Sequence, residues 1–78
     1  MSNRLPHAFG QTLTRLREAR GWSQMTLATK AGLHLNAVGH LERGQRSPTL
    51  PTVFALCRAL EIPVAKFFAA LEKQHPEL

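Results

Sequence analysis

Residues 22–44 read WSQMTLATKAGLHLNAVGHLERG, and this stretch decides the architecture of the chain. Ser23 is a good N-cap for a short helix with a small, apolar inner face. Gly32 tolerates a positive φ, so we expect it to end this helix after about two turns. A further helix then begins at residue 34 or 35 and runs toward Gly44. The stretch therefore predicts two short helices joined by a tight turn, which is a helix-turn-helix.

The helical period recurs on both sides of this stretch, and no segment alternates apolar and polar residues as a strand would. Further helices are expected over about residues 7–20, from residue 49 or 50 to before Pro63, and over about residues 64–72. Gly21 lies where a left-handed cap would end the first of these helices. The sequence thus predicts an all-α, compact five-helix domain spanning residues 1–78. Its core is expected at about 7–72, with a frayed tail at 73–78.

Size and composition exclude several classes of protein. With 78 residues and 8.7 kDa, the chain has room for one domain, which excludes a two-domain enzyme. The single cysteine, Cys57, lies on an apolar stripe as a structural thiol, and the histidines have no metal-ligand spacing with it. No signal-peptide pattern and no apolar run long enough to span a bilayer occur. We therefore expect a cytoplasmic protein without metal, cofactor or membrane partner.

The charge of the chain is positive and unevenly distributed. Ten Lys and Arg residues face five acidic residues, which gives a formal net charge of +5. Residues 1–60 hold eight of the bases and two glutamates, whereas residues 61–78 hold two bases and three glutamates. An excess confined to one part of a small domain predicts a surface that faces a polyanion, with nucleic acid and anionic lipid as candidates.

The pattern of residues around the turn resembles a known family. Residues 24–32 form Gln-x-x-Leu-Ala-x-x-Ala-Gly, and residues 41–44 form Leu-Glu-Arg-Gly at the matching offset. Over about residues 9–68 the chain resembles the phage repressor and Cro type of helix-turn-helix DNA-binding domain, often called the XRE family. The resemblance implies five helices, of which the second crosses the DNA backbone and the third enters the major groove. The Ala-Gly-Leu-His stretch, the Glu-Arg-Gly motif and the small size look most like the controller proteins of restriction-modification systems.

The expected recognition helix carries a polar stripe apart from its apolar face. Asn36, His40 and Arg43 fall at i, i+4 and i+7. An asparagine can bond an adenine edge, Leu35 and Ala37 can touch a thymine methyl group, and a histidine can bond a base or a phosphate. A solvated face is the alternative for Asn36 and His40, and the edge of the core is the alternative for Leu35. The candidate base contacts are Leu35, Asn36, Ala37, His40 and Arg46.

Phosphate contacts are expected to supply most of the affinity. Ser23 and Gln24 begin a helix, where free amides and the helix dipole favour a phosphate oxygen. The resemblance implies that Gln24 clamps a phosphate. Arg43 is assigned to phosphate and Arg46 to phosphate or a base, with a merely solubilising role as the alternative for each. Each phosphate contact removed should lower the slope of log K against log salt by about 0.9.

Arg17 and Glu42 each lie on an apolar helical stripe, where a lone charge would be costly to bury. We therefore expect the two side chains to pair. The resemblance implies the same, because domains of this type often carry an Arg–Glu bridge between the first helix and the end of the third. Removing one partner of a buried pair costs about 3–5 kcal/mol, so the expected role is structural.

The C-terminal phenylalanines predict contact with a second copy of the chain. Phe67 and Phe68 are adjacent, so they lie about 100° apart on a helix. We expect one ring to pack inside and the other to face a second copy with Leu71 or Val64; the alternative is that both complete the monomer core. A two-fold dimer would hold two recognition helices about 34 Å apart and match a pseudo-palindromic operator. The expected interface residues are Val64, Phe67, Phe68 and Leu71.

The sequence thus predicts a sequence-specific, double-stranded DNA-binding transcriptional regulator. It has no glycine-rich phosphate loop and no paired carboxylates near a histidine, so no catalytic residues are assigned. The main alternative is an antitoxin whose principal partner is a toxin, which the neighbouring gene would distinguish. RNA or membrane binding is disfavoured, because the aromatic residues lie at staple or core positions and no helix joins a basic face to a wide apolar one. Repression needs only occlusion of a promoter, whereas activation needs a surface for RNA polymerase, and the resemblance allows both.

Overall fold

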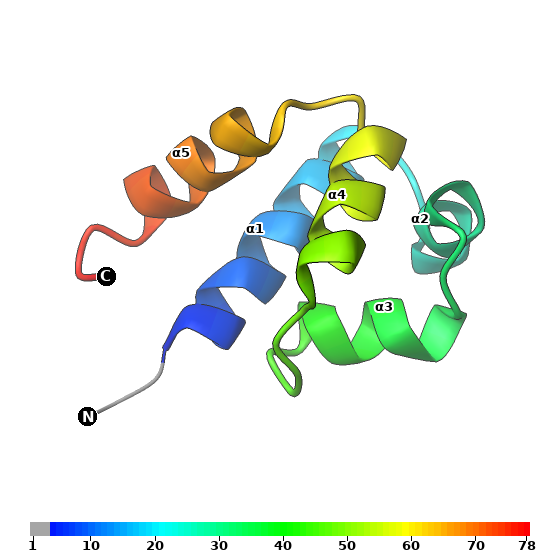
Figure 1. The fold of residues 1–78 in the computed structure, drawn as a ribbon, viewed down its shortest axis with the longest axis horizontal. Coiled ribbons are helices and arrows are strands. Elements are labelled where there is room, and N and C mark those ends of the chain that lie inside the picture. The colour runs from blue at the N-terminus through cyan, green and yellow to red at the C-terminus, as the bar shows by residue number, and fades with distance from the viewer. Residues whose placement is uncertain (1–3) are drawn as a thin grey trace.

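Five α-helices follow one another in residues 4–78, the part of the chain that this computed structural model describes (Figure 1). They are α1 (Leu5–Ala19), α2 (Gln24–Ala31), α3 (Leu35–Glu42), α4 (Leu50–Ala59) and α5 (Val64–Gln74). Residues 4–78 contain no strand, so the all-α prediction is confirmed. Residues 1–3, which the single-domain prediction includes, lie outside the described residues.

Two helix boundaries differ from the expected ones. Helix α1 begins at residue 5 rather than about residue 7, because Pro6 is compatible with the first turn of a helix. Helix α5 continues to Gln74, so residues 73 and 74 are helical rather than part of the tail. The helix ends there because His75 precedes Pro76, and a residue before proline is disfavoured in the helical region.

Capping residues define the helix ends in the helix-turn-helix as predicted. Gly32 ends α2 with a φ of 71°, a left-handed conformation that glycine adopts without steric cost. The hydroxyl of Ser23 accepts a hydrogen bond from the Thr26 backbone N–H at 3.0 Å, which caps the start of α2. Thr49, rather than Leu50, is the N-cap of α4.

The core is one cluster to which every helix contributes. Its largest fully buried side chains come one from each helix: Leu13, Leu27, Val38, Leu56 and Phe67. Helix α1 packs against α3 and α5, and α2 packs against α3 and α4. Figure 1 shows α1 and α4 between α5 on one side and the α2–α3 pair on the other. Helix α3 therefore lies along an outer edge, with its inner face against the core.

Glycine at position 10 is required by the close crossing of α1 and α3. A Cβ atom there would lie 2.4 Å from the Leu41 carbonyl oxygen and 2.5 Å from that of Glu42. Both atoms belong to the backbone and cannot move aside without shifting the helix. The crossing therefore sets how closely the C-terminal end of α3 approaches α1.

The structure buries one phenylalanine of α5 and leaves the other partly exposed, as expected, but it also buries two of the residues assigned to the contact with a second copy. The rings of Phe67 and Phe68 both pack near Phe9 of α1, with centroid distances of 5.0 and 6.3 Å. Phe67 is fully buried and Leu71 is 2% exposed, so both belong to the core of a single chain and offer no surface to a partner. Of the four residues assigned to the interface, only Phe68 and Val64 retain partial exposure.

Candidate nucleic-acid interface

The outward face of α3 and the loop after it carry the residues assigned to base contact. Asn36 is exposed and His40 is half-buried, whereas Val38, on the opposite face, is completely buried. Leu35 is 39% exposed. Ala37 is half-buried. The helix thus presents a mixed polar and apolar face with its core residues turned away.

The polar side chains on this face make no polar contact with the rest of the described chain. Within residues 4–78, no hydrogen bond or ion pair engages the side chains of Asn36, His40, Arg43 or Arg46. Arg46 is exposed in the loop between α3 and α4. Because a polar stripe without internal partners contributes nothing to the core, its donors and acceptors are available to a ligand.

The start of α2 combines an exposed N-cap with an absence of acidic residues in its first turn. Ser23 is exposed and Gln24 is half-buried. The Gln24 side-chain amide donates a hydrogen bond to Glu42 Oε1 at 2.8 Å, a contact that the sequence did not predict. One amide hydrogen and the side-chain carbonyl oxygen of Gln24 remain free for another partner.

The expected pair between Arg17 and Glu42 is present and buried. Arg17 Nε donates to Glu42 Oε2 at 2.6 Å and Nη2 donates to Oε1 at 3.1 Å, so the carboxylate is held at both oxygens. The two side chains are 10% and 5% exposed. This hydrogen bonding with Glu42 raises the pKa of Arg17 above its ordinary value. Arg17 also donates to the Trp22 carbonyl oxygen, at the entrance to α2.

Glu42 consequently joins three helices at one carboxylate. It belongs to the last turn of α3, and it accepts hydrogen bonds from Arg17 on α1 and Gln24 on α2. The attraction between two buried charges offsets the cost of removing them from water only when the charges are close and well oriented. A displacement of either side chain is therefore unfavourable. The carboxylate therefore helps to hold the start of α2 and the exposed face of α3 in one fixed relation.

Two further cations lie beside the start of α2, and sequence reasoning did not find them. The guanidinium of Arg20 lies 5.3 Å from the ring centroid of Trp22, and the ammonium of Lys30 lies 5.0 Å from it. Distances of this size permit cation–π attraction. The hydrophobic position of Trp22 before the N-cap was visible in the sequence, but the approach of both cations depends on how α1 and α2 pack.

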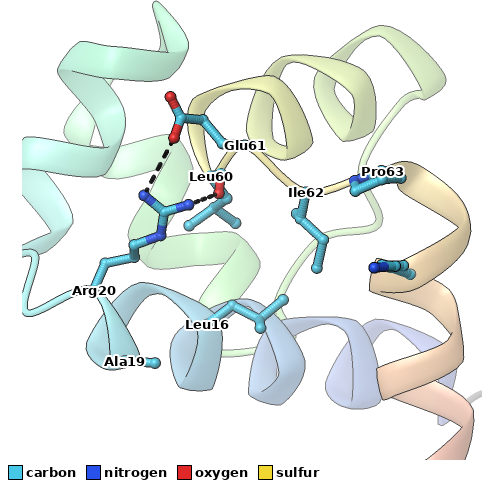
Figure 2. A pocket seen from close by; sticks show the side chains of 8 residues that line it. Leu16, Ala19, Arg20, Leu60, Glu61, Ile62 and Pro63 are labelled. Atoms are coloured by element: carbon cyan, nitrogen blue, oxygen red, sulfur yellow. Dashed lines mark hydrogen bonds and ion pairs between the residues drawn. The ribbon is translucent and has the colours of Figure 1, made fainter.

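A cleft of about 360 Å³ lies between the end of α1 and the segment joining α4 to α5 (Figure 2). Arg20 occupies its rim, where it donates to the Leu60 carbonyl oxygen and lies 3.7 Å from the Glu61 carboxylate. Glu61 has a φ of 55°, a left-handed value that is uncommon for a residue with a Cβ atom. In Figure 1 this segment lies at the opposite side of the molecule from α3. The cleft is therefore separate from the α3 face.

The described residues offer no competing metal or membrane site. No group of three or more His, Cys, Asp or Glu side chains within residues 4–78 is placed to hold a metal ion. In the same part of the chain, no helix has the length and hydropathy needed to cross a bilayer.

Comparisons with known proteins agree with this arrangement. A family model described as "Helix-turn-helix domain" matches residues 8–67. The chain is 33% identical over 67 residues to the HTH-type transcriptional regulator SutR of Escherichia coli (strain K12). That match covers 86% of this chain and 38% of SutR, so the chain spans well under half the length of this relative.

Solved structures with the same fold include two restriction-modification controller proteins. The chain is 44% identical to C.AhdI from Aeromonas hydrophila, with a TM-score of 0.78, covering 81% of this chain and 96% of that one. Wild-type C.Esp1396I superposes with a TM-score of 0.90 at 23% identity, covering 99% of this chain and 100% of that one. At that identity the second likeness shows the fold alone.

Proposed function

The chain belongs to the helix-turn-helix family of the phage repressor and Cro (XRE) type, and on this premise we propose that it is a sequence-specific, double-stranded DNA-binding transcriptional regulator. The outer face of α3 carries the proposal. This face presents Asn36 and His40 without internal partners, while Val38 behind them is fully buried. The major groove of B-form DNA has room for one α-helix, and it displays a distinct pattern of donors and acceptors for each base pair. DNA as the ligand makes the cytoplasm the proposed site of action.

The proposed base contacts follow from side-chain chemistry. The amide of Asn36 matches the N6 and N7 groups of adenine, and His40 can bond a base edge or a phosphate. Leu35 and Ala37 can cover a thymine methyl group, which would remove the exposed part of Leu35 from water. Arg46, in the following loop, can reach a base or a phosphate.

The proposed phosphate anchor is the start of α2. Ser23 and Gln24 stand at the positive end of the helix dipole, and no acidic side chain in the first turn opposes a phosphate there. The hydrogen bond from Gln24 to Glu42 links this anchor to the last turn of α3. An anchor fixed relative to the recognition helix sets the depth at which that helix enters the groove.

We further propose that the chain acts as a homodimer on a pseudo-palindromic operator. Apolar side chains remain exposed on one face that combines the starts of α1 and α4: Leu5 is 52% exposed, Leu50 is 74% exposed and Phe54 is 48% exposed. A groove of about 190 Å³ on this face is lined partly by Leu5, Leu50 and Phe68. Contiguous exposed apolar surface of this kind marks association sites. This face takes the place of the interface expected from Phe67 and Leu71, and it retains Phe68.

Duplex selection followed by fluorescence anisotropy tests the DNA proposal. We expect the wild-type chain to select one sequence, and Asn36→Ala to weaken binding to it by about 5- to 150-fold, the value of one bidentate base contact. Gln74→Ala, a matched loss of an exposed amide on α5, should bind as the wild type does. Equal affinity of the wild type for all duplexes, at low and moderate salt, would refute sequence-specific recognition.

Sedimentation tests the dimer. Leu50→Lys and Phe54→Lys place charges on the apolar face without disturbing the core, so each should shift the chain toward the monomer and weaken binding to a two-site operator. Ala19→Lys, at an exposed residue at the opposite end of α1, is the control. A dimer that both variants leave intact would refute the assignment of the interface.

A further inference from the structure

Gly39 occupies the interior of α3 for a reason other than backbone conformation. Its φ is not positive, unlike those of Gly21, Gly32 and Gly44. Glycine in a helix interior is less favourable than alanine by about 1 kcal/mol, so the position carries a cost. The three heavy atoms nearest to a Cβ atom at this position all belong to the Arg43 side chain.

The side chain of Arg43 lies directly over Gly39. The distances from an ideal Gly39 Cβ position are 3.0 Å to Arg43 Nη1, 3.4 Å to Nη2 and 3.6 Å to Cζ. Helical side chains lean toward the N-terminus and cover the preceding turn, which accounts for the contact between positions i and i−4. The cationic end of Arg43 therefore lies over the middle of α3, although Arg43 itself is the C-cap of the helix.

The sequence placed Arg43 on the same polar stripe as Asn36 and His40 and assigned it to a phosphate. The structure keeps Arg43 on that stripe and brings its guanidinium back over Gly39. Within residues 4–78 no hydrogen bond or ion pair engages it, so its five N–H donors are free.

From this geometry we infer that Arg43 reads a base edge in the major groove and that Gly39 is the positioning residue that lets its guanidinium lie there. The chemistry of the planar fork selects guanine, whose O6 and N7 atoms accept two parallel N–H donors. The inference rests on the proposed function, because it requires α3 to enter the groove. Gly39 acts through Arg43 and makes no base contact of its own.

The test measures affinity for the selected duplex and for a panel in which each base pair of a half-site is replaced in turn. The variants are Arg43→Ala, Arg43→Lys, Gly39→Ala and the double variant Gly39→Ala/Arg43→Ala. Arg58→Ala removes an exposed arginine from α4 and is the matched control. Thermal unfolding of each variant verifies that it folds.

We expect Arg43→Ala to lose about 5- to 150-fold of discrimination at one G·C pair in each half-site and to keep the preferences at other positions. Arg43→Lys retains the charge without the fork, so it should lose discrimination at the same pair while its salt slope stays near the wild-type value. Gly39→Ala should melt at a higher temperature and still lose discrimination at that pair, because the methyl group displaces the guanidinium. In the Arg43→Ala background, Gly39→Ala should change binding less than about two-fold.

Each contrary outcome overturns a specific step. If Arg43→Ala weakens all duplexes equally and lowers the salt slope by about 0.9, Arg43 contacts a phosphate and the inference is wrong while the proposed function stands. If Gly39→Ala keeps full discrimination, or acts equally without Arg43, its positioning role is wrong. A wild-type chain that prefers no duplex refutes the proposed function itself.

Discussion

Replacing Glu42 with alanine removes the carboxylate that joins α1, α2 and α3, and we expect it to lower the free energy of unfolding by about 3–5 kcal/mol. Arg17 would keep its charge with a side chain only 10% exposed. Its remaining acidic neighbour, Glu18, lies 3.7 Å away and is 65% exposed, so it compensates for less than about 1 kcal/mol. The Gln24 amide would also lose its acceptor.

Equilibrium unfolding in urea, followed by the fluorescence of Trp22, measures this loss. A 78-residue domain has a total stability of about 4–12 kcal/mol, so the expected loss is a large share of it and Glu42→Ala can unfold outright. Glu42→Gln keeps an acceptor oxygen of the same shape and should lose less, about 1–3 kcal/mol. Glu18→Ala is the control and should change stability by less than about 0.5 kcal/mol.

The sign of the pH dependence follows from the Arg17 pKa. The hydrogen bond with Glu42 raises that pKa in the folded state, so the stabilisation is fully present below the ordinary arginine pKa and is lost only as the pH rises through the folded value. The stability difference between the wild type and Arg17→Met should therefore stay constant from about pH 6 to pH 10. A cost below about 1 kcal/mol for Glu42→Ala would show that the pair is solvated and that the α1–α3 crossing is wrong.

Four further predictions concern other features of the fold. Glu61 has a positive φ that glycine adopts more easily, so Glu61→Gly should raise the free energy of unfolding by about 0.5–1 kcal/mol. Glu61→Ala removes only the carboxylate and should give no such gain. If both variants gain stability in thermal unfolding, the backbone explanation is contradicted. Gly10→Ala places a methyl group 2.4 Å from a backbone oxygen of α3, so it should lower the free energy of unfolding by more than about 3 kcal/mol. A variant that unfolds at the same urea concentration as the wild type would disprove the close crossing. Ser23→Ala removes the N-cap of α2 and should cost about 1 kcal/mol in urea unfolding, while Ser23→Asp should recover most of it; equal losses for both would argue against the cap. Burial raises the pKa of the Cys57 thiol, so the thiol ionises in the unfolded chain before it does in the folded one. The free energy of unfolding should therefore fall above about pH 9, and it should fall less in Cys57→Ala. Fast alkylation of the folded wild type at about pH 8 would contradict the burial.

Signals that act within a few residues were sufficient to predict the helices and their order. Gly32 and Ser23 perform the expected roles because a positive φ and an N-cap hydrogen bond depend only on neighbouring backbone atoms. The pairing of Arg17 with Glu42 was also predictable, since each charge lies on an apolar stripe and neither could be buried alone.

Rotation of each helix about its axis was decided only by tertiary packing. Adjacent positions such as Phe67 and Phe68 differ by about 100°, and the helical period alone does not determine which of them faces the core. The contact of α5 with Phe9 turned Phe67 inward and left Phe68 at the edge, which moved the proposed dimer face toward Leu50.

The residues of the candidate nucleic-acid interface were likewise only partly predictable from the sequence. The sequence by itself determined that α3 would turn Val38 inward and Asn36 outward, because a packed helix separates its apolar and polar faces. Only the tertiary structure brought Gln24 on α2 to Glu42 on α3. Long side chains have several rotamers of similar energy, and the neighbours that select one of them exist only after the helices have packed.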